Sequence, residues 1–174
     1  MRARRGAKCL RFLVSPSMPL CNPTVHPRFD VRMLAPSCAL NRRGYNIGVR
    51  LIDEFLAKAQ VGPCSSFTET AEVIAKVGFK MFLGVTAEVA GATSTEFSLQ
   101  LAENPLAEFV ELPEQYSGLA YSNMLCGVLR GALEMVQMRV ECTLTKDALW
   151  GDDVTEIRVV LKEMMEEEYI DEDG

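Results

Sequence analysis

The stretch YSNMLCGVLRGALEMVQM, residues 121–138, decides the fold, because it could be a membrane span, a dimerisation helix or the central core helix of a soluble domain. It is mostly apolar and carries two charges, Arg130 and Glu134. Each charge would cost about 2.5–3.5 kcal/mol near the middle of a bilayer. Their i, i+4 spacing suits the exposed strip of a soluble helix. The pattern predicts a core helix, in which Gly127 and Gly131 let another backbone element approach closely.

Charge is distributed unevenly along the chain. Residues 1–43 contain nine Lys or Arg, one acid, five Pro and no sustained apolar period, whereas residues 44–174 contain nine bases and twenty-three acids. We expect residues 1–43 to be a basic, disordered extension, although an Arg-rich, acid-poor leader is also typical of an organelle transit peptide. The acidity of the remainder argues against binding of nucleic acid.

Two helices are predicted between these segments. The first begins at the cap Asn46 and ends near Ala59, with its apolar residues at helical spacing, namely Ile47, Leu51, Ile52, Phe55 and Leu56. The second begins with the capping box Ser66-x-x-Glu69 and ends before Gly84. Its apolar residues extend over more than one side of the helix, so we expect other parts of the protein to pack on more than one of its sides.

Four alternating segments predict strands, namely Phe97–Leu101, Leu106–Leu112, Val140–Leu144 and Glu156–Leu161. The first two are expected to form a hairpin that turns at Asn104-Pro105. The fold class is therefore α+β, with helices packed on one face of a four-stranded antiparallel sheet. A single domain over residues 44–164 is followed by an acidic tail, residues 165–174, that we expect to be disordered.

The sequence offers little catalytic or metal-binding chemistry. Its six cysteines are irregularly spaced, and its one histidine, His26, lies in the N-terminal extension. No zinc site is predicted, and a cysteine hydrolase would lack a histidine base in the folded region. Cys126 and Cys142 fall in apolar patterns and are predicted to be buried, reduced thiols of a cytosolic protein. Gly151–Asp153 predicts a turn between strands. We therefore expect that the protein is not an enzyme and that it binds no metal.

Five blocks carry a family resemblance, and together they span about residues 43–163. They are GYNIGVRLIDEFLAKAQVGPC, ETAEVIAKVGFKMFLGVT, EFSLQLAENPLAEFVELP, YSNMLCGVLRGALEMVQM and GDDVTEIRVVLKE. In this order they resemble the Bet-three family, the palmitoylated core subunits of the TRAPP (transport protein particle) vesicle-tethering complex. The family begins with a long helix that residues 1–42 do not match, so this helix is expected to be missing or replaced.

The resemblance implies a cytoplasmic scaffold subunit located peripherally at the cis-Golgi and the endoplasmic reticulum. It implies pairing with sibling TRAPP subunits through the helices, as a heterodimer or a homodimer, and peripheral contact with the Golgi membrane. It further implies a non-catalytic part in a guanine nucleotide exchange factor complex that activates a Rab-type GTPase in transport from the endoplasmic reticulum to the Golgi. In the family the C-terminal end can approach that GTPase, and here it is strongly acidic.

The resemblance also implies a palmitoyl thioester on the cysteine that closes the VGxC segment, which is Cys64 here, and no other cofactor. Pro63 replaces the arginine usual before that cysteine. Cys64 lies two residues before the predicted cap Ser66, close to the positive end of the helix dipole. Gly78 could leave room for a narrow acyl channel, for which Ile74, Gly78, Met81 and Phe82 are the candidate lining. The alternative is a sensor of the related hydrocarbon-binding fold, which would hold a free hydrophobic molecule in the same channel.

Overall fold

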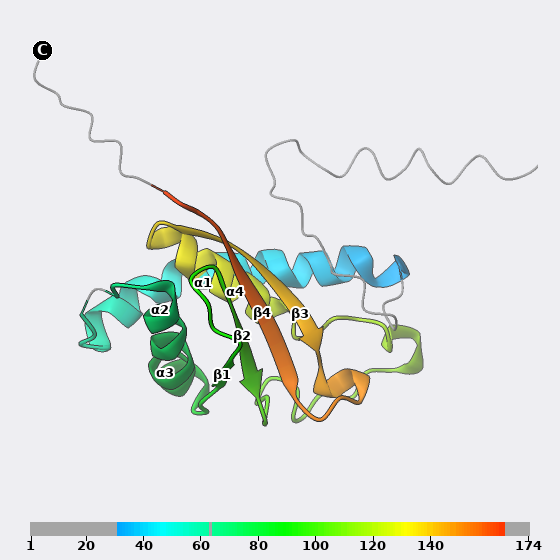
Figure 1. The fold of residues 1–174 in the computed structure, drawn as a ribbon. Helices are drawn as coiled ribbons and strands as arrows, with labels where there is room; N and C mark the ends of the chain where they lie inside the picture. Colours follow the sequence, from blue (N-terminus) through cyan, green and yellow to red (C-terminus); the bar gives the residue numbers. More distant parts are fainter. Residues whose placement is uncertain (1–30, 63, 166–174) are drawn as a thin grey trace, which may run out of the picture.

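The computed structural model describes residues 31–62 and 64–165 (Figure 1). In chain order its elements are η2 (Val31–Met33), α1 (Leu34–Lys58), α2 (Phe67–Val73), the π-helix η3 (Ile74–Gly78), α3 (Phe79–Leu83), β1 (Glu88–Ala90), β2 (Glu96–Leu101), η4 (Glu114–Tyr116), α4 (Asn123–Met135), β3 (Met138–Lys146), η5 (Ala148–Trp150) and β4 (Thr155–Met164). Helices lie on one side of the strands, which confirms the α+β prediction (Figure 1).

The sheet has the order β1-β2-β4-β3, and every neighbouring pair of strands is antiparallel. Its covered face presents side chains that are at most 1% exposed, namely Phe97, Leu99, Leu101, Ile157 and Val159. The opposite face carries ion pairs that cross from strand to strand, such as Arg158 with Glu96 and Lys162 with Glu141. The period-2 pattern of the sequence therefore reports correctly which residues of β2 and β4 face the core.

Helix α4 packs on the sheet, and α1 packs on α4. A Cβ atom built on Gly127 would lie 2.0 Å from the Asn41 carbonyl oxygen, and one built on Gly131 would lie 2.3 Å from the Tyr45 carbonyl oxygen. The glycines of α4 thus bring another backbone close, as predicted. A reciprocal pair on α1 was not predicted: a Cβ on Gly44 or Gly48 would lie 2.0 or 2.1 Å from a carbonyl oxygen of α4.

The predicted start of the first helix at Asn46 is wrong, because α1 begins at Leu34. Its Pro36 lies in the first turn, where the missing amide N–H breaks no intrahelical hydrogen bond. Its buried residues are mostly small or polar, namely Ser37, Asn41, Gly44, Gly48 and Ile52, so no hydrophobic period marked them. The domain boundary expected between residues 43 and 44 therefore falls inside α1. The expectations for residues 1–30 and 166–174 lie outside the described residues.

The predicted hairpin of Phe97–Leu101 with Leu106–Leu112 is also wrong. The Ala107 amide donates to the Asn104 carbonyl oxygen over 2.9 Å, and the Val110 amide donates to the Ala107 carbonyl oxygen over 3.0 Å. These short-range bonds make a series of turns, and the partner of β2 on this side is the three-residue strand β1. Leu106 and Ala107 face inwards while Glu108 and Phe109 face solvent, an order that a strand with its period of two does not give.

Candidate functional site

Cys64 is half-buried in the segment that leads into α2, and a tight capping arrangement fixes its neighbours. The Ser66 hydroxyl accepts from the Glu69 amide over 3.1 Å, which confirms the predicted cap. The Glu69 carboxylate accepts from both the amide and the hydroxyl of Ser65, over 2.7 and 2.8 Å. Hydrogen bonding from the Ser65 amide, and then from its hydroxyl, lowers the pKa of Glu69. The backbone directly after Cys64 is therefore held in one conformation.

The other three described cysteines lie within helices or strands. Cys126 is fully buried in α4, in agreement with the prediction. Cys142 is half-buried on β3 against the core, and desolvation raises the pKa of its thiol to about 12. Cys38 lies half-buried within α1. Of these four cysteines, Cys64 is the one that lies outside any helix or strand, and it is therefore the candidate for acylation.

The helix after Cys64 is continuous from Phe67 to Leu83 but includes the π-helical turn η3, which the sequence analysis did not predict. Phe67 packs on Phe97 of β2 with 4.8 Å between ring centroids. Ala71 and Ala75 are 0% exposed, so the helix lies close to the sheet along this side. Gly84 ends the helix with φ of +76°, a conformation that glycine adopts without steric cost.

The predicted acyl-channel residues lie along this helix at spacings of four, three and one residues. Ile74 and Gly78 belong to the π-helical turn, and Met81 and Phe82 belong to α3. Ile74 packs partly buried against the core, Gly78 and Phe82 are half-buried, and Met81 is 36% exposed. A Cβ on Gly78 would lie 3.9 Å from Cε2 of Phe55, in ordinary contact. These positions are compatible with a channel between this helix and α1, and the channel itself stays a prediction.

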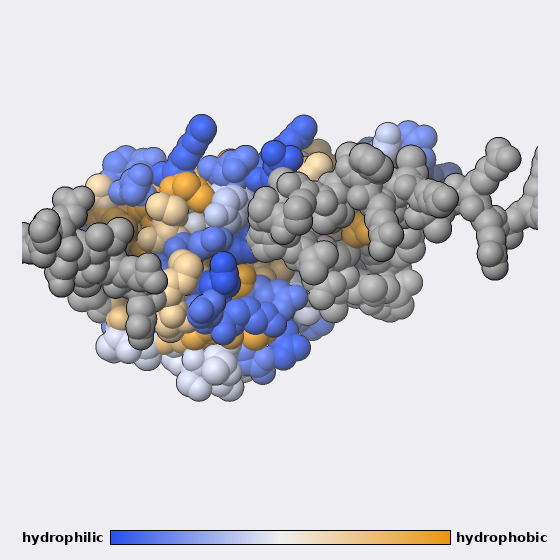
Figure 2. Space-filling view, turned by 90° about the horizontal axis from the view of Figure 1, so that it is seen from above, coloured by the Kyte–Doolittle hydropathy of each residue, from blue (hydrophilic) through white to orange (hydrophobic). Residues whose placement is uncertain are grey.

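Helix α1 exposes apolar side chains beside its buried strip. Ile47 is 42% exposed, and Leu40 and Leu51 lie half-buried on the same side of the helix. Leu56 is 60% exposed and lies nine residues after Ile47, which places it on the opposite side. Seen from above, hydrophobic residues remain visible between hydrophilic ones on the molecular surface (Figure 2). Helix α1 therefore has apolar surface left for a partner.

The helix face with Arg130 and Glu134 is less exposed than predicted. Both side chains are half-buried, and the Arg130 guanidinium lies 5.1 Å from the centroid of the Tyr45 ring. Burial raises the pKa of Tyr45, the charge of Glu134 and a hydrogen bond to it add to the rise, and Arg130 opposes it. These two charges thus help to pack α4 against α1.

Among residues 31–62 and 64–165, no group of three or more His, Cys, Asp or Glu side chains could hold a metal ion. Asp152 accepts a hydrogen bond from the Asp147 amide over 3.0 Å, and Gly151 has φ of +87°. These features form the predicted turn between β3 and β4. None of the helices in the described part of the chain is both long enough and apolar enough to span a membrane.

Comparison with known proteins identifies the family. The family model for "Transport protein particle (TRAPP) component" matches residues 26–160. This chain belongs to the TRAPP component family. The match begins upstream of Leu34, in agreement with the early start of α1.

Relatives similar to this TRAPP component are named as subunits of the transport or trafficking protein particle. Trafficking protein particle complex subunit 3 of Dictyostelium discoideum is 62% identical over 129 residues, which cover 72% of this chain and 69% of the relative. Transport protein particle subunit bet3 of Schizosaccharomyces pombe is 52% identical over 132 residues, with 74% and 72% covered. A crystal structure of subunit 3 from Naegleria fowleri, covalently bound to palmitic acid, has 52% identity and a TM-score of 0.74, and the match covers 78% of this chain and 85% of that one.

Proposed function

We propose that this TRAPP component carries a palmitoyl thioester on Cys64 and acts as a non-catalytic scaffold subunit. It pairs with sibling TRAPP subunits through α1. The assembly tethers vesicles and activates a Rab-type GTPase in transport from the endoplasmic reticulum to the Golgi, with peripheral contact to those membranes. No nucleic acid and no metal take part.

The observation that carries the acylation is the covalently bound palmitic acid of the Naegleria fowleri relative, at 52% identity. Cys64 is the described cysteine that best fits this chemistry, because it is neither enclosed in the core nor part of a helix or strand. Palmitoylation of cysteine is reversible in general. The hydrogen bonds of Ser65 and Ser66 to Glu69 fix the chain next to the thioester, so the acyl chain would leave Cys64 in a defined direction.

In this proposal the acyl chain lies along the helix that follows Cys64, past Ile74 and Gly78 towards Met81 and Phe82. Burial of an acyl chain contributes about 0.8 kcal/mol per CH₂ group. A chain enclosed in this way adds to the core and does not anchor the protein in a membrane.

Intact-mass spectrometry of the full chain from eukaryotic cells tests the acylation. The wild-type chain should carry a covalent acyl adduct, and Cys64→Ser should remove it. Cys38→Ser is the matched control, because it removes another half-buried thiol, and this variant should keep the adduct. An adduct that persists in Cys64→Ser would refute the site. A hydrophobic molecule that dissociates on unfolding would instead favour the sensor function.

A further inference from the structure

Phe109 is the most exposed of the large hydrophobic side chains in the described ranges, at 88%. It lies in the loop between β2 and α4, on the segment that the sequence analysis mistook for a strand. A phenylalanine at such exposure leaves nearly its whole ring in water, which costs free energy unless a partner covers it.

The loop presents this ring on a rigid base. The Asn104 side-chain oxygen accepts from the Leu106 amide over 3.1 Å, and the amides of Ala107 and Glu108 donate to the Asn104 carbonyl oxygen over 2.9 and 3.1 Å. Leu106 packs against the core and Ala107 is only 8% exposed. Because these bonds hold the backbone of the loop before binding, little entropy of loop ordering is lost when a partner covers Phe109.

A buried polar network connects this loop to the turn between β3 and β4. The Asn104 side-chain amide donates to the Ser122 hydroxyl over 3.0 Å, and that hydroxyl donates to the Asp147 carboxylate over 3.0 Å. Asp147 is 0% exposed. Leu101 at the end of β2 is paired with Thr155 at the start of β4, so both segments leave the same end of the sheet. The loop and the turn therefore form one surface.

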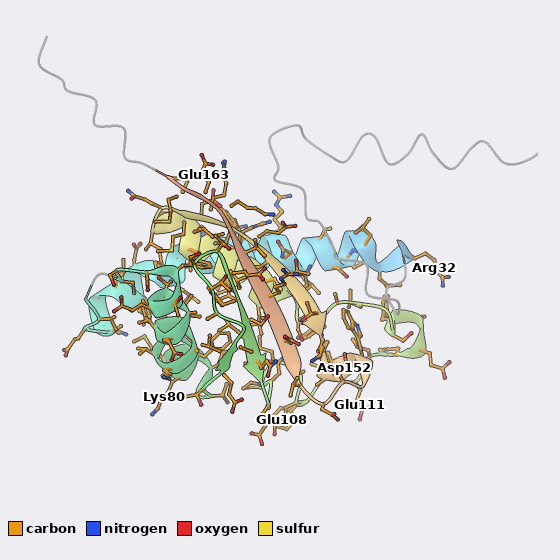
Figure 3. All side chains as sticks on the ribbon, in the orientation of Figure 1. Arg32, Lys80, Glu108, Glu111, Asp152 and Glu163 are labelled. Atoms are coloured by element: carbon orange, nitrogen blue, oxygen red, sulfur yellow. The ribbon has the colours of Figure 1, made fainter. Side chains whose placement is uncertain are left out.

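This surface is acidic. Residues 102–118 contain four glutamates, Glu103, Glu108, Glu111 and Glu114, and no lysine or arginine, and all four are exposed. Asp152 and Asp153 add two carboxyl groups from the turn, and Lys146 is paired with Glu156 at 2.9 Å. Glu108, Glu111 and Asp152 all lie towards the lower end of the molecule in Figure 3. We call the exposed side chains of residues 103–114 and Asp153 the acidic end.

We propose that the acidic end is a protein-docking surface, in which Phe109 enters an apolar pocket of a partner whose rim carries lysine or arginine. Charge complementarity selects this partner, because the glutamates would repel an anionic membrane surface and an acidic protein alike. The surface is separate from the exposed residues of α1. The inference rests on the proposed function in one respect, namely that the partner belongs to the same assembly, so that the subunit joins two neighbours.

The test places the photo-crosslinking residue benzoylphenylalanine at position 109 of the full chain, purifies the assembly through a tag, and maps the cross-linked site. Two variants are then compared with a control. They are Phe109→Ser and the double variant Glu108→Lys/Glu111→Lys, and the control is Glu88→Lys, which reverses an exposed charge on β1. We expect a cross-link to a protein site bordered by basic residues. Phe109→Ser should weaken binding of that neighbour about thirtyfold or more, as for an interface hot spot.

The double charge reversal should also weaken that binding and reduce its dependence on salt, whereas Glu88→Lys should leave both unchanged. Melting temperatures should stay the same, because these side chains are exposed. Cross-links to lipid, to a second copy of this chain or to an acidic site would overturn the proposal, as would unaltered binding by Phe109→Ser. The proposed function is tested separately by whether sibling subunits co-purify with the wild-type chain at all, and Ile47→Asp should release the sibling at α1 while the cross-link from position 109 persists.

Discussion

At the scale of the residue, Gly78 is where the proposed acyl channel can be tested without changing Cys64. An added Cβ would lie 3.9 Å from the Phe55 ring and 4.0 Å from the Val73 carbonyl oxygen, so alanine fits without displacing either group. Gly78→Ala should therefore keep the adduct and stabilise the helix by about 0.5–1 kcal/mol. Gly78→Leu should lower the acylated fraction, because its branched side chain would occupy the space that the chain needs. Intact mass and thermal melting measure both effects.

Full acylation of Gly78→Leu would contradict the channel assignment, even with Cys64 confirmed as the acylated residue. The contrast between Gly78→Ala and Gly78→Leu depends on the space beside Gly78. The sequence alone could suggest the channel at this position but could not establish that space. The missing side chain of Gly78 is visible in the sequence, whereas the ring of Phe55, twenty-three residues earlier, is placed opposite it only by the packing of α1.

At the scale of the element, the crossing of α1 and α4 depends on backbone contact at glycines. Gly131→Leu should destabilise the fold by at least about 1–3 kcal/mol, because even its Cβ would lie 2.3 Å from the Tyr45 carbonyl oxygen and the helices would have to separate. Arg130→Ala is the neighbouring control. It removes the contact with the Tyr45 ring, worth about 0.5–2 kcal/mol in general. Chemical denaturation should rank Gly131→Leu as the more damaging change, and the reverse order would refute this packing.

The same crossing explains which elements could be predicted from the sequence. Helix α4 and strands β2, β3 and β4 bury apolar side chains at regular periods, and the period identified them. Helix α1 buries serine, asparagine and glycine against α4: the Asn41 side-chain amide donates to the Asn123 side-chain oxygen over 3.2 Å, and the Ala120 amide donates to the Ser37 hydroxyl over 3.2 Å. Hydrophobic periodicity cannot detect such an interface. A second GxxxG spacing, Gly44 and Gly48, was the available signal, and it was overlooked.

The short strand β1 and the turns after β2 escaped prediction for a different reason. β1 has only three residues on the edge of the sheet, too few for a pattern. In residues 106–112, Leu106 and Ala107 face inwards and Glu108 and Phe109 face solvent, as successive turns require, and a short run of mixed apolar and polar residues does not separate such turns from a strand.

For the candidate site, the capping box and the helix end at Gly84 were predictable because each depends on residues close together in the sequence. The π-helical turn had no sequence signal that we recognised.

At the scale of the whole molecule, the chain has more apolar surface on α1 than its own fold covers. Ile47 is 42% exposed, with the half-buried Leu40 and Leu51 on the same side of the helix, and together they form a stripe. Leu56 is 60% exposed on the opposite side, away from this stripe. A stripe of this kind suits a helix of a sibling subunit, because apolar side chains at helical spacing are the usual contacts between packed helices.

Expressed alone, the chain should therefore self-associate, and co-expression with a sibling subunit should give a defined heterodimer. Ile47→Asp should abolish both forms of association, because a carboxylate buried at a helix contact without a cation costs more than the contact gains. Leu56→Asp introduces the same charge on the other side of α1 and should leave both intact. Analytical ultracentrifugation of the two variants, alone and with the sibling, distinguishes them. A wild-type chain that sediments as a monomer, or an Ile47→Asp variant that still pairs, would show that α1 does not carry the interface.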